Sequence, residues 1–154
     1  MDSSSLQPTV FIYGGFDNLK TPQIRFLQEA SRLGKVHILL FSDRVSLTVN
    51  GKKPNFLESE RRYYFESIRY VSRLSVLDNF VNEDEIPNIN TIRENDQVQS
   101  IWAVMENQAN SEKRDFCRKH NMQYRIIPRD DLVGFPDNNT SLQHEGSKQK
   151  KVVV

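Results

Sequence analysis

Residues 10–23, which read VFIYGGFDNLKTPQ, decide the fold. An apolar strand ends in the paired glycines Gly14 and Gly15, and a helix begins a few residues later. Glycine lets the backbone approach a ligand closely, while a helix N-terminus offers free N–H groups and the positive end of a dipole. The stretch therefore fits two interpretations, an anion-binding turn and an ordinary strand-to-helix turn.

The start of that helix puts two polar side chains next to the glycine turn. We expect Thr21 to be the N-cap and Pro22 to be the first helical residue. Lys20 and Gln23 then lie beside the positive end of the helix. In the anion-site interpretation, these two side chains are the ones placed to meet a phosphate.

Beyond this stretch, the chain alternates between strand and helix patterns. Strands are expected over 9–13, 36–41, 74–77, 100–105 and 124–127, helices over 22–33, 57–70, 111–119 and part of 82–95, and a loop over 44–56. Ser111 is the expected cap of the helix that runs through Lys119. This alternation predicts an α/β fold, a single Rossmann-like doubly wound domain with a five-stranded, mostly parallel sheet. We place the domain at 9–136, with a flexible N-terminus over 1–8 and a polar, disordered tail over 137–154.

Parallel doubly wound sheets bind ligands outside the carboxyl ends of their strands. Four expected strand ends should therefore converge on one crevice: Gly14–Gly15, Ser42–Asp43, Glu106–Asn107 and Pro128–Arg129. Asp43 is a candidate polar contact there, although an aspartate after a strand is also a common turn residue.

Composition narrows the range of partners and compartments. The chain has 154 residues, with 21 Lys and Arg against 20 Asp and Glu, a formal net charge of +1. This balance gives no long-range attraction to nucleic acid or to an anionic membrane, so we expect neither as a partner. A single cysteine excludes an internal disulfide, and no segment reads as a signal peptide or a membrane span. The cytoplasm is the expected location.

Two stretches carry a family resemblance. Residues 14–27, GGFDNLKTPQIRFL, resemble the G-T-F-D-x-x-H-x-G-H signature of the cytidylyltransferase-like nucleotidyltransferases, which include glycerol-3-phosphate cytidylyltransferase and the nucleotidyltransferase domain of the ADP-heptose synthases. Residues 60–71, ERRYYFESIRYV, resemble a second helix motif of that family. The likeness covers roughly residues 9–135. It implies transfer of a nucleotidyl group from CTP or ATP to a phosphate monoester with release of pyrophosphate, Mg²⁺ when a nucleoside triphosphate is bound, and an assembly that is often a homodimer.

The resemblance also assigns site residues. Lys20 and Gln23 stand where the family has its two catalytic histidines, and Pro22 replaces the glycine between them. The residues that the resemblance places at the nucleotide or phosphates are Gly14, Gly15, Phe16, Asp17, Lys20, Gln23, Asp43, Lys53, Arg61 and Arg129. For Lys53, a solvated loop lysine is the alternative interpretation. No metal ligand set is expected from the protein itself.

Departures from the family pattern leave the activity open. Gln23 cannot carry a positive charge, and loss of one transition-state donor typically costs on the order of 10²–10³ in rate. The family's closing Ser/Thr run is also missing, because Asp130–Asn138 reads DDLVGFPDN. Two hypotheses follow: a nucleotidyltransferase with a divergent active site, and a non-catalytic module on the same fold that binds a nucleotide, a phosphometabolite or a partner.

Overall fold

The computed structural model describes residues 6–79, 82–93 and 95–136. The described ranges leave out the expected tail over 137–154 and residues 1–5 of the expected flexible N-terminus. Within them the elements are β1 (Thr9–Gly14), α1 (Thr21–Ser31), β2 (Lys35–Phe41), α2 (Asp43–Asn50), α3 (Glu58–Glu66), β3 (Val71–Leu77), α4 (Ile89–Ile92), β4 (Ser100–Met105), η2 (Glu106–Gln108), α5 (Ser111–Lys119), β5 (Gln123–Ile127) and η3 (Arg129–Leu132).

The five strands form one sheet in the order β3-β2-β1-β4-β5. All four neighbouring pairs are parallel, which confirms the predicted Rossmann-like α/β sheet and makes it fully rather than mostly parallel. The order reverses between β1 and β4, because β2 and β3 build outward on one side and β5 on the other. In sheets of this kind, that reversal is where a crevice opens at the carboxyl edge.

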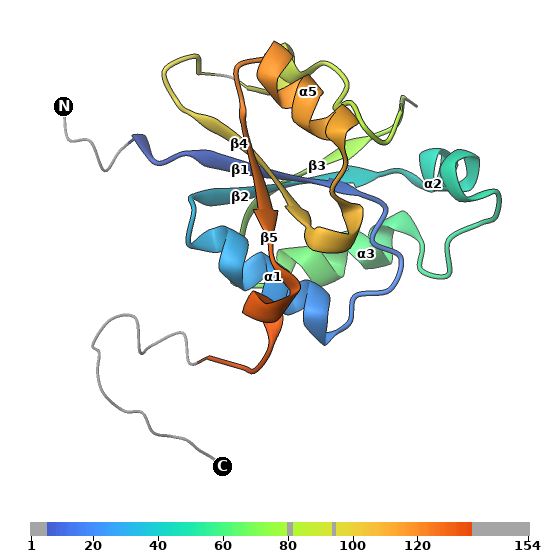
Figure 1. The fold of residues 1–154 in the computed structure, drawn as a ribbon. Coiled ribbons are helices and arrows are strands. Elements are labelled where there is room, and N and C mark those ends of the chain that lie inside the picture. The colour runs from blue at the N-terminus through green and yellow to red at the C-terminus, as the bar shows by residue number, and fades with distance from the viewer. Residues whose placement is uncertain (1–5, 80–81, 94, 137–154) are drawn as a thin grey trace.

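Each face of the sheet is covered by helices, as Figure 1 shows with α1 and α3 below the sheet and α5 above it. Alternate residues of a strand point to opposite faces, so Val10 and Ile12 pack under α1 while Phe11 packs toward α4 and α5. The described part of the chain contains no helix that is both long and apolar enough to cross a bilayer.

Residues 44–56 were expected to be a loop, and most of this prediction is wrong. Ser42 caps α2 by accepting a hydrogen bond from the Val45 backbone N–H at 3.1 Å. The helix ends at Gly51, whose φ of 78° lies in the left-handed region that terminates helices. Gly51 and Pro54 suggested a loop over the whole of 44–56, but both residues lie after the helix, in the second half of that segment. The helix expected over 57–70 is also shorter, since α3 covers only Glu58–Glu66. The strand expected over 74–77 is longer, since β3 already begins at Val71.

Candidate functional site

A cleft of about 650 Å³ opens at the carboxyl edge between β1 and β4, where the strand order reverses. Its walls come from the end of β1 and the turn after it, from the end of β4 with η2, and from the start of α5. Residues of α1, the end of α2 and the segment at Glu83 and Asp84 complete the lining. The cleft thus lies at the place where the fold predicts a ligand site.

The glycine turn lies in the cleft wall, but its strained residue is Phe16. Neither Gly14 nor Gly15 has a positive φ, whereas Phe16 has a φ of 51°, which is uncommon for a bulky residue. The Phe16 ring folds back over Gly14, where an added Cβ would lie 3.2 Å from it, and packs edge-on against Phe65. Gly14 is therefore needed to leave room for a side chain of the same turn.

Asp17 holds the turn to a distant loop. One carboxylate oxygen accepts the backbone N–H of Asn55 at 2.7 Å, and the other accepts that of Phe56 at 2.8 Å. Asp17 borders the cleft, yet both of its oxygens already have backbone partners.

The N-terminus of α1 is capped by the chain itself. The N-cap is Lys20 rather than Thr21, and Pro22 is the second helical residue. The Gln23 side-chain oxygen accepts the Lys20 backbone N–H at 2.9 Å, while the Gln23 N–H donates to the Lys20 carbonyl. Pro22 has no N–H to offer. The donors that the anion-site interpretation requires are thus largely used or missing.

Arg61 is the centre of a buried polar network. Its side chain is 1% exposed, and it donates to the carbonyl oxygens of Gly15, Phe41 and Phe56 at 2.8–2.9 Å. It also donates to the Asp43 carboxylate at 2.7 Å, and Asp43 accepts the N–H at the start of α3. We call Asp17, Asp43 and Arg61 the brace, because together they join the ends of β1 and β2 to the loop before α3.

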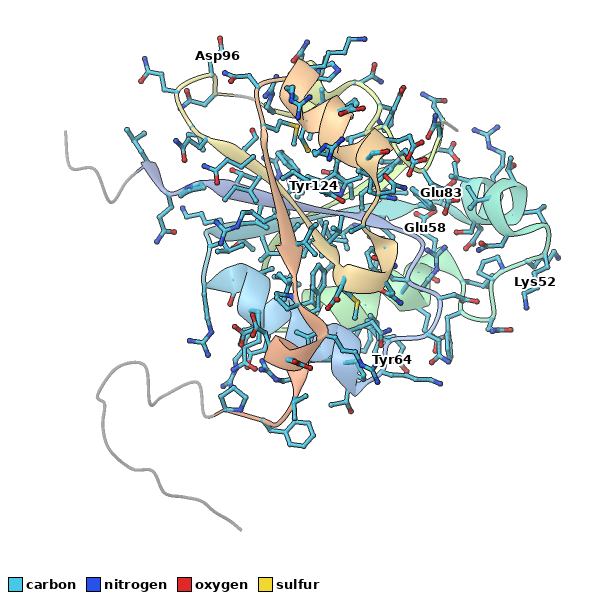
Figure 2. All side chains as sticks on the ribbon, in the orientation of Figure 1. Lys52, Glu58, Tyr64, Glu83, Asp96 and Tyr124 are labelled. Carbon is cyan, nitrogen blue, oxygen red and sulfur yellow. The ribbon has the colours of Figure 1, made fainter. Side chains whose placement is uncertain are left out.

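Two further predicted phosphate ligands are exposed and lie outside the cleft lining. Lys53 is in the connection between α2 and α3, next to Lys52, which Figure 2 shows at the rim of the molecule. Arg129 begins η3, and its backbone N–H donates to the Glu106 carboxylate at 2.8 Å. That hydrogen bond brings the ends of β4 and β5 together. A ligand role for Lys53, Arg61 or Arg129 stays a prediction.

The opposite wall of the cleft contains charged residues that the sequence did not single out. Asp84 accepts hydrogen bonds from the Lys113 ammonium at 2.8 Å and from the Asn110 side chain at 2.9 Å. These bonds, Lys113 first, lower the pKa of Asp84 below its usual value. Asn110 also caps α5 through the Lys113 backbone N–H, one residue before the cap expected at Ser111.

Aromatic side chains form part of the cleft floor. Tyr13 packs edge-on against Phe41 and Trp102, with ring centroids 4.9 and 5.8 Å apart. The Tyr13 hydroxyl donates to the carbonyl oxygens of Asn82 and Glu85, each 3.1 Å away. Burial first, and then the nearby carboxylates, raise the pKa of Tyr13 far above its ordinary value, so this hydroxyl remains a donor.

The charge of the cleft lining is the reverse of what a polyphosphate requires. Lys113 is the one cationic side chain among the described residues that line it, and Asp84 pairs with that lysine. The lining carboxylates are Asp17, Glu83 and Asp84. The described residues also contain no group of three or more His, Cys, Asp or Glu side chains placed to hold a metal ion.

The comparisons with known proteins establish the fold. No family model matches the chain, and no curated protein matches it. Among solved structures, the chain is similar to the crystal structure of the lipopolysaccharide core biosynthesis protein from Thermoplasma volcanium GSS1, with a TM-score of 0.58 and 23% sequence identity. The match covers 79% of this chain and 94% of that one. The likeness confirms the Rossmann-like α/β fold of the chain.

Proposed function

We propose that this protein is a nucleotidyltransferase-like binding module that holds a small ligand in the cleft without transferring a nucleotidyl group. One observation carries the proposal: the single lysine among the described residues of the cleft lining is already paired with Asp84 at 2.8 Å. Phosphoryl and nucleotidyl transfer depend on positioning and on donors that meet charge as it develops on the phosphates. The lining offers that charge no free cation.

The self-capped start of α1 supports the same proposal. In the resembling family, two histidines at this position touch the phosphates as charge develops on them. Here Gln23 is neutral, and its oxygen accepts the Lys20 backbone N–H. Pro22 removes one more donor.

Lys20 is the observation that favours the second candidate, a divergent nucleotidyltransferase. Its side chain is exposed beside the cleft and forms no ion pair among the described residues. A flexible lysine at this place is a point charge that is able to reach a phosphate. In that candidate, Lys20 and Gln23 are the catalytic residues, and Mg²⁺ bridges the phosphates of CTP or ATP.

A pyrophosphate-release assay separates the two candidates. CTP or ATP is offered with Mg²⁺ and a phosphate monoester such as glycerol 3-phosphate to the unmodified protein and to Lys20→Met. We expect pyrophosphate at the no-protein background for both proteins. Release by the unmodified protein that is lost in Lys20→Met would establish a catalytic lysine. The matched control is Lys35→Met, because Lys35 is an exposed lysine at the opposite, amino end of the sheet.

A further inference from the structure

We propose that the cleft selects a ligand without phosphate groups, of the chemical class of a free nucleoside, and that each added phosphate weakens binding. This inference rests on the proposed function, because it concerns what the same non-catalytic cleft holds. It departs from the family resemblance, in which the phosphates are the main point of attachment.

A phosphate in the cleft would meet more negative than positive charge on the lining side chains. Three carboxylates line the cleft against one ammonium group, and Asp84 neutralises that group at 2.8 Å. Glu83 is exposed at the cleft lining, and it has no hydrogen-bond or ion-pair partner among the described residues that would offset its charge. Like charges brought together in a partly enclosed site repel more strongly than they do in water. A triphosphate therefore enters this cleft against the field of its walls.

Some of the backbone N–H groups at the two helix starts beside the cleft are already bonded within the protein. Backbone N–H groups at a helix start are the usual alternative for holding a phosphate. At α1, the Gln23 oxygen is 2.9 Å from the Lys20 nitrogen and takes up its N–H. At α5, the Asn110 oxygen takes up the Lys113 N–H at 2.8 Å. At each helix start that borders the cleft, one N–H group is thus taken up by a side chain of the protein itself.

The lining offers a ligand carboxamide groups and an aromatic surface. Six carboxamide side chains line the cleft, and Gln23 and Asn110 already make hydrogen bonds within the protein. The other four each have a donor and an acceptor and no side-chain hydrogen bond among the described residues: Asn18, Asn50, Asn107 and Gln108. Paired donors and acceptors suit the polar edge of a heteroaromatic base, and carboxylates such as Glu83 suit sugar hydroxyls. The apolar part of the floor includes Tyr13, which is half-buried and packs on the buried Trp102, and an aromatic side chain of this kind suits contact with a planar ring. A volume of about 650 Å³ is ample for a nucleoside.

The test compares one base with and without phosphates. Isothermal titration calorimetry is run with cytidine, CMP and CTP, and with adenosine, AMP and ATP, with EDTA present so that no divalent cation screens the phosphates. For one of the two bases, we expect affinity to fall from nucleoside to monophosphate to triphosphate, with the triphosphate at least about tenfold weaker than the nucleoside.

Two charge variants locate the effect in the cleft wall. Asp84→Asn frees the Lys113 ammonium, and Glu83→Gln removes the uncompensated carboxylate. In the double variant, we expect the gap between nucleoside and triphosphate to shrink about tenfold or to reverse. The matched control is Asp96→Asn, which makes the same charge change in the segment before β4, at the end of that strand remote from the cleft (Figure 2). It should leave the order of affinities unchanged.

The outcomes separate this inference from the proposed function. If CTP or ATP binds more tightly than its nucleoside in EDTA, the inference is overturned, while the proposed function stands as long as no pyrophosphate is released. If no compound of either series binds, a nucleoside-like ligand is likewise overturned. Pyrophosphate release above background overturns the proposed function, whatever the order of affinities. An unchanged gap in the double variant shows that the carboxylates do not set the selectivity.

Discussion

The carboxyl edge of the sheet has two halves that use polar residues in opposite ways. Beyond β1 and β2, the brace satisfies its own charges, since Arg61 and Asp43 bond to one another and to backbone groups. Beyond β1 and β4, the cleft leaves amide and carboxylate side chains facing an open space. Asp17 and Arg61 lie in the two stretches that carry the family resemblance, yet the hydrogen bonds of Asp17, Asp43 and Arg61 go to the protein.

This difference shows how a fold can be kept while its chemistry changes. A buried arginine with four partners cannot be replaced without leaving polar groups unpaired, so the pattern around it is constrained by stability alone. The side chains that line the cleft make fewer hydrogen bonds to the rest of the protein, so a substitution there leaves fewer polar groups unpaired. The identities of these side chains can change with the ligand.

The largest expected effect is on the brace. Arg61→Met keeps much of the apolar length of the side chain but leaves Asp43 and three carbonyl oxygens without their donor. The Asp43 side chain is 41% exposed, but each buried acceptor left without its donor typically costs about 1–3 kcal/mol, so we expect a total loss of about 3–5 kcal/mol. Urea denaturation followed by circular dichroism should show a loss of that size. Arg62→Met is the control, since Arg62 is exposed and its ion pair with Glu66 is long, at 3.6 Å.

If Arg61→Met cost no more than Arg62→Met, the brace would be dispensable to the fold. Arg61 would then be available for the phosphate contact that the resemblance implies.

The comparison between the predicted and the observed environment of Arg61 shows what the sequence was able to predict. Strand and helix periodicity located all five strands, and β4 begins and ends at the predicted residues. The same reasoning placed Arg61 at the carboxyl edge, because its motif follows the family pattern. It gave no way to tell that the guanidinium group is buried and fully engaged, since its carbonyl partners belong to backbone at Gly15, Phe41 and Phe56.

The cleft wall around Asp84 was missed for a related reason. Asp84 and Lys113 are 29 residues apart, and only the packing of α5 beside β4 and β5 brings them together. A usable signal was present at Asn110, because asparagine is a preferred N-cap and lies shortly after the end of β4. The prediction of Ser111 as the cap left Asn110 outside the helix start, and Asn110 is the side chain that lines the site.

A smaller effect is expected at Asp17, which belongs to the brace and also borders the cleft. Asp17→Ala removes the acceptor of two backbone N–H groups, at 2.7 and 2.8 Å, and should lower the free energy of unfolding by about 2 kcal/mol. Urea denaturation measures the loss, and Asp96→Ala, at an exposed aspartate in a loop, should stay within about 0.5 kcal/mol of the unmodified protein. If the two variants were equally stable, Asp17 would be free to serve the ligand rather than the fold.

The smallest effect is expected at Asp84, on the cleft side, and it depends on pH. Hydrogen bonds from Lys113 and then Asn110 lower the pKa of the folded Asp84 carboxyl below its value in the unfolded chain. The folded state therefore binds this proton less readily than the unfolded state does. The stabilising contribution is complete above the unfolded pKa of about 4, and it is lost as the pH falls through the lower folded pKa.

Asp84→Asn should cost about 1 kcal/mol at pH 7 and almost nothing at pH 2, as measured by urea denaturation at both values. Asp96→Asn should show no such convergence, because Asp96 forms no ion pair among the described residues. A loss at Asp84→Asn that stayed the same at both pH values would mean that its contact with Lys113 does not depend on charge. The cleft would then lack the paired lysine on which its selectivity against phosphates is argued.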